Sequence, residues 1–437
     1  MWLLAGQKAP DHSTIARFRT GFLLEACEDL FYQMVRRLKD AGELSVETVF
    51  IDGTKLEACA NKYTFVWKKS VGKWEEKMFQ KIQEAVMLLN HEYMQSFSVK
   101  IDSRIQDLQT ITRYLENKCQ QDGTVFVYGR GKRKSKNQKY FELFRKFQER
   151  QVTYDWHTAS FQGRNNYCKT DPDATFMHMK DDHMRNAQLK PGYNIQIGVD
   201  SEYIVATDIF SDRNDVWTLI PFLKTMDEKL GFRYLSVTAD SGYESEEGYT
   251  YLRETRQTPY IKPQTYEKWK RRSFKQDISK RENMAYDAET DVYTCYAQKK
   301  LSPVFVKKQK SKSGYESEVT VYECEDCKDC SHKEKCTRAK GNKRLYVSKS
   351  FLEKRQESYE NILTETGIQY RMNRSIQVEG AFGVLKNDYE FQKFLLRGKN
   401  KVKLEILLLC MGYNLNKLHA KIQNERIGFH LFKVKSA

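Results

Sequence analysis

The sequence of 437 residues contains no run of 18 apolar residues, so we expect no transmembrane helix. Its opening residues, Met-Trp-Leu-Leu-Ala-Gly, lack a basic region, and their apolar run is too short for a secretory signal peptide. The sequence also shows no internal repeat. These absences, together with cysteines that are partly clustered, favour a protein of the cytoplasm.

Acidic residues are in deficit. Asp and Glu number 58 against 74 Lys and Arg, and the formal net charge is +16 at pH 7. A large basic protein attracts polyanions, and nucleic acid is the first candidate because neutralising its phosphates releases condensed counterions. The alternative is a protein whose lysines only keep its surface hydrated and bind no nucleic acid. Hydrophobic residues make up 40% of the chain, which indicates a globular protein rather than a disordered one.

Two segments concentrate the basic residues. The run from 130 to 139 follows a glycine-containing stretch and is either a phosphate-contacting loop or a solvated linker. Its candidate DNA-binding residues are Arg130, Lys132, Arg133 and Lys134. The segment 266–274 mixes aromatic and basic residues, which either stack on unpaired bases or form an amphipathic segment with a solvated face.

Apolar periodicity predicts strands and helices in an α/β order. The expected strands are 48–55, 193–199, 203–210 and 234–239, with a hairpin of 303–308 and 315–322. The expected helices are 11–42, charged coiled-coil-like helices over 66–121, 215–230, a long helix containing Glu379, and a last helix over 400–421. This order fits a mixed sheet with flanking helices.

Three carboxylates are the best candidates for catalysis. Asp52 lies in the first expected strand, Asp240 follows the strand 234–239, and Glu379 lies on a helix. Glu379 and Lys386 are seven residues apart, which on an α-helix places both on one face about 10 Å apart along the axis. Carboxylates suit Mg²⁺ (or Mn²⁺) beside a phosphate, and two such ions can assist an in-line displacement.

Four cysteines lie within 13 residues, at positions Cys324, Cys327, Cys330 and Cys336. Thiolates at such short spacings bind Zn²⁺ tetrahedrally, and a closed site of this kind is structural. Cys295 and His332 are possible substitutes for one ligand. The alternative is a set of free cysteines in a loop.

Three blocks of the sequence resemble the catalytic blocks of DDE transposases from bacterial insertion sequences. They are Phe50-Ile-Asp-Gly-Thr-Lys-Leu-Glu-Ala58, Val237-Thr-Ala-Asp-Ser-Gly-Tyr243 and Arg374-Ser-Ile-Gln-Val-Glu-Gly-Ala-Phe-Gly-Val-Leu-Lys386. The intervening segments 170–177, 190–196 and 214–215 are also similar, so the resemblance covers nearly the whole chain. It points most closely to the insertion-sequence family named eleven-eighty-two.

The resemblance implies an RNase H-like core in which Asp52, Asp240 and Glu379 bind two divalent ions. It also implies a Tyr, Arg, Glu, Lys signature in the third block, whose Arg and Lys contact DNA phosphates. Glu379 and Lys386 match that signature, whereas Arg374 lies five residues before the Glu instead of the usual four, and Tyr370 is displaced likewise.

The organisation expected from this resemblance has six parts. They are a remnant of an N-terminal helical DNA-binding region (1–45), the first part of the RNase H-like core (46–66), a helical basic insertion (67–190), core strands and helices (191–264), a Cys-rich, zinc-ribbon-like insertion (265–350) and C-terminal helices with the catalytic Glu (351–437). Family members usually carry a helical region before the segment that opens this chain, so we expect an amino-terminally shortened copy or a misassigned start.

The expected function is a transposase that cuts DNA at the terminal repeats of a mobile element and joins the freed 3′-hydroxyl to target DNA. Such reactions hold two ends together, so we expect a homodimer on DNA in the bacterial cytoplasm, associated with the nucleoid. Two alternatives remain: an RNase H-like nuclease that cleaves without joining, and an inactive DNA-binding protein derived from a transposase.

Overall fold

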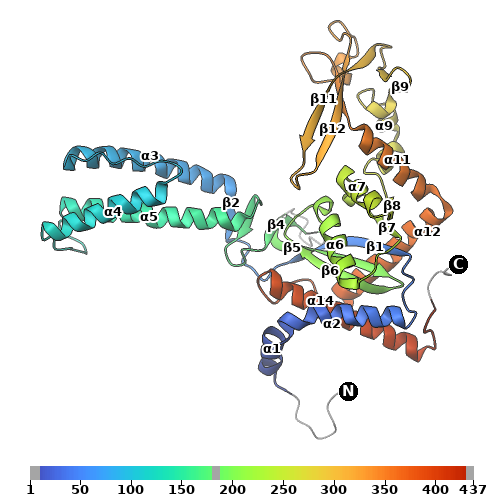
Figure 1. The fold of residues 1–437 in the computed structure, drawn as a ribbon, viewed down its shortest axis with the longest axis horizontal. Coiled ribbons are helices and arrows are strands. Elements are labelled where there is room, and N and C mark those ends of the chain that lie inside the picture. Colours follow the sequence, from blue (N-terminus) through green and yellow to red (C-terminus); the bar gives the residue numbers. More distant parts are fainter. Residues whose placement is uncertain (1–9, 180–187, 430–437) are drawn as a thin grey trace. The chain divides into compact units, whose positions relative to one another are not determined.

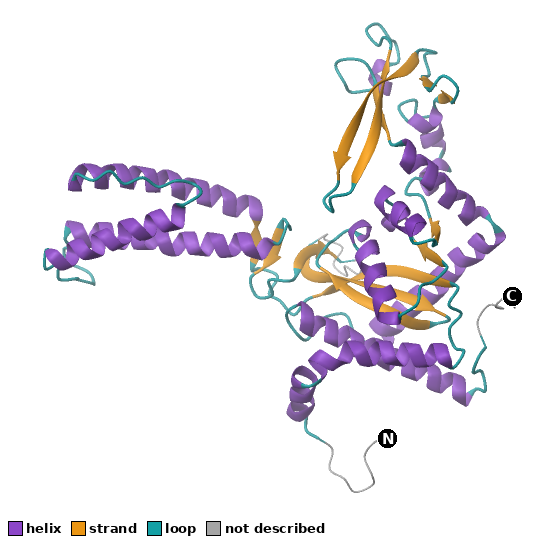
Figure 2. Ribbon diagram, in the orientation of Figure 1, coloured by secondary structure: helices purple, strands orange, loops and turns teal. Residues whose placement is uncertain are grey.

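The computed structural model describes residues 10–179 and 188–429, and the chain divides into two compact units. The first comprises Met1–Leu56 and Tyr193–Ala437, and the second comprises Glu57–Gly192. Both units contain helices and strands (Figure 1, Figure 2). Each unit has its own buried residues, and each is described by itself.

The main sheet has the order β4-β5-β1-β7-β8, and β6 pairs with β5. Its strands are β4 (Thr175–His178), β5 (Leu189–Asp200), β6 (Tyr203–Phe210), β1 (Thr48–Glu57), β7 (Ser236–Ala239) and β8 (Thr258–Ile261). β1, β7 and β8 run parallel, whereas β5 and β6 form an antiparallel hairpin. The predicted mixed sheet is therefore confirmed, and it is compatible with an RNase H-like core.

Strands β1 and β7 form because their apolar residues are buried on both faces of the sheet. Val49, Phe50, Ile51 and Val237 are all at most 3% exposed, as continuous burial of parallel strands predicts. A polar side chain in such a strand lacks water unless it reaches the rim of the sheet. The two aspartates that end this apolar stretch therefore stand out chemically.

Helices pack on the sheet and on each other. α14 (Lys399–Gln423) contacts both β6 and α2 (Leu23–Asp40), while α11 (Lys349–Leu363) and α12 (Glu365–Arg374) contact β8. α6 (Leu219–Leu230) packs on α2, and α7 (Glu246–Glu254) follows β7. The helices predicted over 11–42 are α1 (His12–Gly21) and α2, which meet at Phe22.

The cysteine-bearing region of the first unit contains a second, antiparallel sheet. Its order is β13-β12-β11-β10-β9, and its strands are β9 (Ala285–Asp287), β10 (Val292–Thr294), β11 (Lys300–Lys310), β12 (Glu316–Cys324) and β13 (Arg344–Val347). The predicted hairpin is confirmed as β11 and β12, which extend further than expected. Its tip meets α7, where the Ser313 hydroxyl donates to Glu247 at 2.5 Å.

Short helical segments connect the two sheets. They are α8 (Tyr266–Trp269), α9 (Arg272–Lys275) and the 3₁₀ turn Arg281–Asn283, whereas α10 (Lys333–Cys336) lies between β12 and β13 of the second sheet. The Tyr266 ring packs beside Tyr359 of α11, and cations lie over it, among them Lys270 at 4.2 Å. The segment 266–274 thus lies against α11, and its stacking on bases remains a prediction.

The second unit is built on α3 (Lys68–Tyr93), α4 (Arg104–Gln121) and α5 (Lys136–Phe161), beside the short strand pair β2 (Phe65–Trp67) and β3 (Asn166–Cys168). Its core includes Ile82, Leu89, Ile111 and Phe144. The charged helices over 66–121 were predicted, whereas α5 was missed. Its charged and aromatic residues gave no regular apolar stripe in the sequence.

Candidate active site

Asp52 and Asp240 lie at the same edge of the main sheet. β1 and β7 are parallel neighbours, and Ile51 pairs in register with Ala239. The next residue is Asp52 in β1, which continues to Glu57, and Asp240 directly after the end of β7. Both aspartates therefore lie level with the carboxyl end of β7, where open α/β sheets place their ligands. Asp52 is only 8% exposed.

Asp52 has two polar partners. Its Oδ1 accepts the N–H of Gly53 at 2.7 Å, and its Oδ2 lies 3.1 Å from Nη1 of Arg374. The side chains of this ion pair are 12% and 18% exposed. The guanidinium of Arg374, itself shielded from solvent, therefore compensates the negative charge of Asp52.

Asp240 caps a 3₁₀ turn (Ser241–Tyr243), because its Oδ1 accepts the N–H of Gly242 at 2.8 Å. Burial raises the pKa of its carboxyl above the ordinary value, and the charge of Asp52 raises it further. The Gly242 hydrogen bond and Arg374 oppose that rise. The charges of Asp52 and Arg374 thus act in opposite directions on the Asp240 carboxyl.

A third carboxylate, Asp215, joins these two and was not singled out from the sequence as a site residue. It begins the 3₁₀ turn Asp215–Trp217, where a regular helix over 215–230 was expected. The pKa of buried Tyr243 is raised first by burial and then by the charges of Asp215, Asp52 and Asp240. The Asn-Asp pair before a helix was the only signal in the sequence.

Glu379 lies on an irregular helix. The segment continues α12 through a π turn (Ser375–Glu379), an α turn α13 (Gly380–Gly383) and a second π turn (Val384–Asp388). The prediction of a regular α-helix is therefore wrong in this segment, whereas a shared face for Glu379 and Lys386 stays a prediction. Hydrogen bonds of a π turn join residues five apart instead of four, so the face of each residue shifts.

The π turn accounts for the unusual spacing before Glu379. Arg374 precedes Glu379 by five residues, and the π turn occupies the five positions that end at Glu379. A five-residue step along a π turn corresponds to a four-residue step along an α turn, because one additional residue is accommodated in the turn. The inserted residue is thus absorbed by the helix, without displacing Arg374 from the face on which it meets Asp52.

The structure does not bring Glu379 into contact with the aspartates. Glu379 is exposed, and among residues 10–179 and 188–429 no hydrogen bond or ion pair joins it to Asp52 or Asp240. Ideal Cβ atoms on Gly380 and Gly383 would meet nothing within 4 Å, so this stretch of helix borders open space. Lys386 is half-buried on the second π turn.

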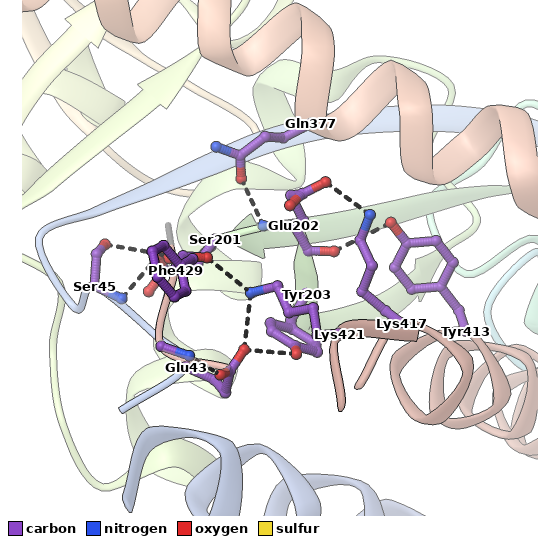
Figure 3. A network of polar contacts seen from close by, with 12 residues as sticks. Glu43, Ser45, Ser201, Glu202, Tyr203, Gln377, Tyr413, Lys417, Lys421 and Phe429 are labelled. Atoms are coloured by element: carbon purple, nitrogen blue, oxygen red, sulfur yellow. Dashed lines mark hydrogen bonds and ion pairs between the residues drawn. The ribbon is translucent and has the colours of Figure 1, made fainter. Parts of the chain in front are cut away.

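Neighbouring side chains anchor this helix to the sheet. Buried Gln377 accepts the N–H of Glu202, in the turn between β5 and β6, at 3.0 Å (Figure 3). Lys417 of α14 binds the Glu202 carboxylate at 2.7 Å, and Tyr413 donates to the Glu202 carbonyl (Figure 3). The position of the helix that carries Glu379 is therefore tied to the β5–β6 turn.

Tyr370 packs against the sheet. Its ring meets the rings of Phe50 and Tyr260 edge-on, with centroids 6.0 and 5.1 Å apart. Burial raises its pKa to about 12. These contacts give Tyr370 a packing role, and a contact with DNA remains a prediction.

The basic run lies in the second unit, directly before α5. Arg130, Lys132 and Arg133 are exposed, whereas Lys134 is half-buried and forms an ion pair with Glu142. Three of the four predicted DNA-binding residues are thus accessible. The fourth is already neutralised by a carboxylate.

The predicted zinc ligands surround one small cavity of about 20 Å³, roughly the size that one water requires. Its lining includes Cys295, Cys324, Cys327, Cys330, His332 and Cys336. The N–H of Lys343 donates to Cys327 Sγ at 3.4 Å. Burial raises the pKa of the Cys324 thiol to about 12 and also raises that of Cys336.

Neither set of candidate ligands is arranged as a finished metal site. Within the described part of the chain, no three His, Cys, Asp or Glu side chains are placed so that they could hold a metal ion. The donor chemistry nevertheless fits: hard carboxylate oxygens at the sheet edge suit Mg²⁺ or Mn²⁺, and thiols around a small cavity suit Zn²⁺. Binding would require side-chain movement at both places.

Comparison with known proteins supports one class. Residues 294–419 match the family model described as "Transposase DDE domain". The match contains the cysteine cluster, Glu379 and Lys386, and it ends before the last residues of α14. Searches of curated proteins and of solved structures found no match.

This match supports a DDE transposase, a class of enzyme that implies DNA as the partner. Asp52 and Asp240 lie outside the matched residues, so their place in the class depends on the geometry described above. No helix among the residues that the structure describes is long and apolar enough to cross a membrane.

Proposed function

We propose that the protein is a DDE transposase of the insertion-sequence type, in which Asp52, Asp240 and Glu379 bind divalent metal. It nicks DNA at the ends of a mobile element and transfers the freed 3′-hydroxyl to target DNA. The observation that carries the proposal is the pairing of Ile51 with Ala239, because it places two remote aspartates side by side at one sheet edge. Arg374 of the helix that leads to Glu379 already contacts Asp52 there.

Each residue has a distinct task in this proposal. Asp52 and Asp240 supply carboxylate oxygens from adjacent strands, and Glu379 supplies a third after the helix moves toward them. Arg374 compensates Asp52 until a cation binds and then becomes available for a DNA phosphate, with Lys386 as a second positive charge. Two bound divalent ions would supply an activated water or 3′-hydroxyl and stabilise the leaving oxygen.

The test is a strand-transfer assay with a supercoiled target and a pre-cut DNA end, in Mg²⁺ or Mn²⁺. The proposal expects joined products with the wild-type chain and none with D52N, D240N or E379Q. Hydrolysis without joining would favour the RNase H-like nuclease. Metal-dependent nicking that D52N leaves unchanged would contradict the assignment of the catalytic aspartates and favour the inactive, DNA-binding alternative.

We also propose that the cysteine cluster binds one structural zinc ion. The convergence of five cysteines on one cavity supports this, as does the amide hydrogen bond to Cys327. A zinc ion would link the end of β12 to the turn after β10, in a sheet whose central strand β11 is almost fully exposed. DNA binding as a homodimer and membership in the family eleven-eighty-two remain part of the proposal.

A further inference from the structure

Buried side-chain amides of strand β5 hold the Asp215 carboxylate. Its Oδ1 accepts from Nδ2 of Asn194 at 2.8 Å and from Nε2 of Gln196 at 3.1 Å. Asn194 and Gln196 lie on the same face of β5 and are at most 1% exposed. Gln196 in turn accepts a hydrogen bond from the hydroxyl of Tyr243, which is fully buried. The Asp215 carboxylate therefore has a fixed position, because its anchors are fixed themselves.

The same carboxylate lies close to the backbone that follows each aspartate. A Cβ on Gly53 of β1 would lie 3.1 Å from Asp215 Oδ1, with the Gln196 amide nearer still, and a Cβ on Gly242 would lie 3.3 Å from Asp215 Oδ2. Gly53 directly follows Asp52, and Gly242 is two residues after Asp240. A side chain at either glycine would meet Asp215, so one carboxylate lies beside both segments.

This arrangement bears on the distance between Asp52 and Asp240. Parallel pairing brings the two strands side by side, but the pairing ends at Ile51 and Ala239 and leaves the next side chains free to diverge. A rigid group beside both segments limits that divergence. Its negative charge also adds to theirs, which favours a divalent cation over the single guanidinium of Arg374.

We propose that Asp215 is a positioning residue of the transposase site, which sets the separation of Asp52 and Asp240 and strengthens their attraction for a divalent cation. The inference rests on the proposed function. Asp215 acts through its proximity to Gly53 and Gly242, beside the two aspartates, and through its charge, as groups behind metal ligands do. Loss of such groups typically weakens metal binding about ten- to a hundredfold.

The first experiment measures Mn²⁺ directly. Calorimetric titration of the DNA-free protein and the Mn²⁺ concentration for half-maximal nicking are compared for wild type, D215N and D212N. The D215N substitution keeps the size of the side chain and an oxygen for the amides but removes the charge, whereas exposed Asp212 is a matched charge control three residues away. We expect D215N to bind Mn²⁺ about tenfold more weakly than wild type and to need about tenfold more Mn²⁺ for half-maximal nicking. D212N should match wild type in both measurements. Wild-type Mn²⁺ binding by D215N would overturn the inference.

A second variant keeps the test informative if D215N folds poorly. In G242A the new methyl group would lie 3.3 Å from Asp215 Oδ2 and 3.0 Å from Asp240 Oδ1, so the contact shifts while every charge remains. We expect G242A to raise the Mn²⁺ requirement, and we expect its effect to shrink in a chain that also carries D215A, because alanine removes the carboxylate that the methyl group meets. Additive effects in the double variant would contradict a shared contact.

The D52N variant distinguishes failure of the positioning role from failure of the proposed function. If D52N abolishes nicking at every Mn²⁺ concentration while D215N behaves as wild type, the positioning role fails and the proposed function stands. If D52N nicks as well as wild type, the proposed function fails. Circular dichroism spectra and melting temperatures of all variants establish that the differences do not come from unfolding.

Discussion

Arg374 and Asp52 form a shielded ion pair, with Nη1 and Oδ2 3.1 Å apart, between positions 322 residues apart in the chain. The pair links the first strand of the sheet to the helix that leads to Glu379. A cation bound at Asp52 competes with this guanidinium for the same carboxylate. The pair therefore connects metal binding to the position of the helix.

Replacing Arg374 by Gln should destabilise the metal-free protein, because the shielded carboxylate of Asp52 loses its compensating charge near Asp240. We expect a loss of about 3 kcal/mol in the free energy of unfolding. Saturating Mn²⁺ should stabilise R374Q more than wild type, since the metal restores the missing positive charge. Urea unfolding with and without Mn²⁺ measures both.

The control is R253Q, which removes an exposed guanidinium paired with Glu353 and Glu357. An exposed pair contributes less than about 1 kcal/mol, so R253Q should change little. Equal effects of the two substitutions, or no additional Mn²⁺ stabilisation of R374Q, would count against the competition.

Replacing Gln377 by Ala should lower nicking more than DNA affinity. The variant loses the hydrogen bond to the Glu202 N–H, which holds the helix against the β5–β6 turn. The cost in stability is about 1 kcal/mol, so the fold persists while the position of Glu379 is less well defined. Single-turnover nicking and fluorescence anisotropy with labelled DNA separate these effects.

The matched control for Q377A is Q356A. Gln356 is exposed, and its side-chain amide donates a hydrogen bond to Glu360 on its own helix. A fall in nicking rate for both variants would show that the Gln377 contact has no special role. An unchanged nicking rate in Q377A would have the same meaning.

Glu405 should make the stability pH-dependent. Burial raises the pKa of its carboxyl, although the N–H groups of Leu395 and Leu396 oppose the rise. The folded protein then holds a proton that the unfolded chain releases near pH 4.5, so stability falls as the pH rises from there through the raised pKa. In E405Q this part of the pH dependence should be absent.

The measurement is urea unfolding between pH 4 and pH 8, and the difference between wild type and variant isolates Glu405 from other buried acids. E390Q is the control, because Glu390 is exposed in the preceding loop. If the difference between wild type and E405Q is flat over this range, Glu405 titrates as an ordinary carboxyl group.

Purified protein should contain one zinc ion per chain, and C327S should lose it. Removal of the ion should expose the sheet β9–β13 to proteolysis, because its few buried residues include the cysteines themselves. Elemental analysis and limited trypsin digestion measure the two effects. C59S, which changes a cysteine of the second unit, should keep its zinc. A metal-free wild-type protein with an intact sheet would exclude the zinc site.

Local patterns predicted strands β1, β5, β6 and β7 of the main sheet, but not β4 or β8. The apolar runs before Asp52 and Asp240 are continuous, and continuous apolar runs indicate strands buried on both faces. The β11–β12 hairpin was also evident, because turn residues separate two stretches of β-forming residues. These features depend on residues that are close together in the chain, so the sequence alone is enough to predict them.

The irregular helix could not be predicted in the same way. A π turn has no distinctive residue pattern, and the segment 375–388 reads as an ordinary helix with two glycines. Only the displaced Arg374 signalled an additional residue in the turn. The helix α5 was missed for a related reason, since its long charged stretch carries only a weak apolar stripe.

The sequence by itself determined strands β1, β5, β6 and β7, the β11–β12 hairpin, several helices, the basic charge, the clustered cysteines and the candidate acidic residues, because these follow from composition and short-range periodicity. Only the tertiary structure decided that Arg374 neutralises Asp52, that Asp215 stands beside both aspartates, and that Glu379 remains exposed. These relationships join residues separated by tens to hundreds of positions. Strand register, helix winding and packing bring such residues together or keep them apart. The spacing of residues along the chain does not reveal these three properties.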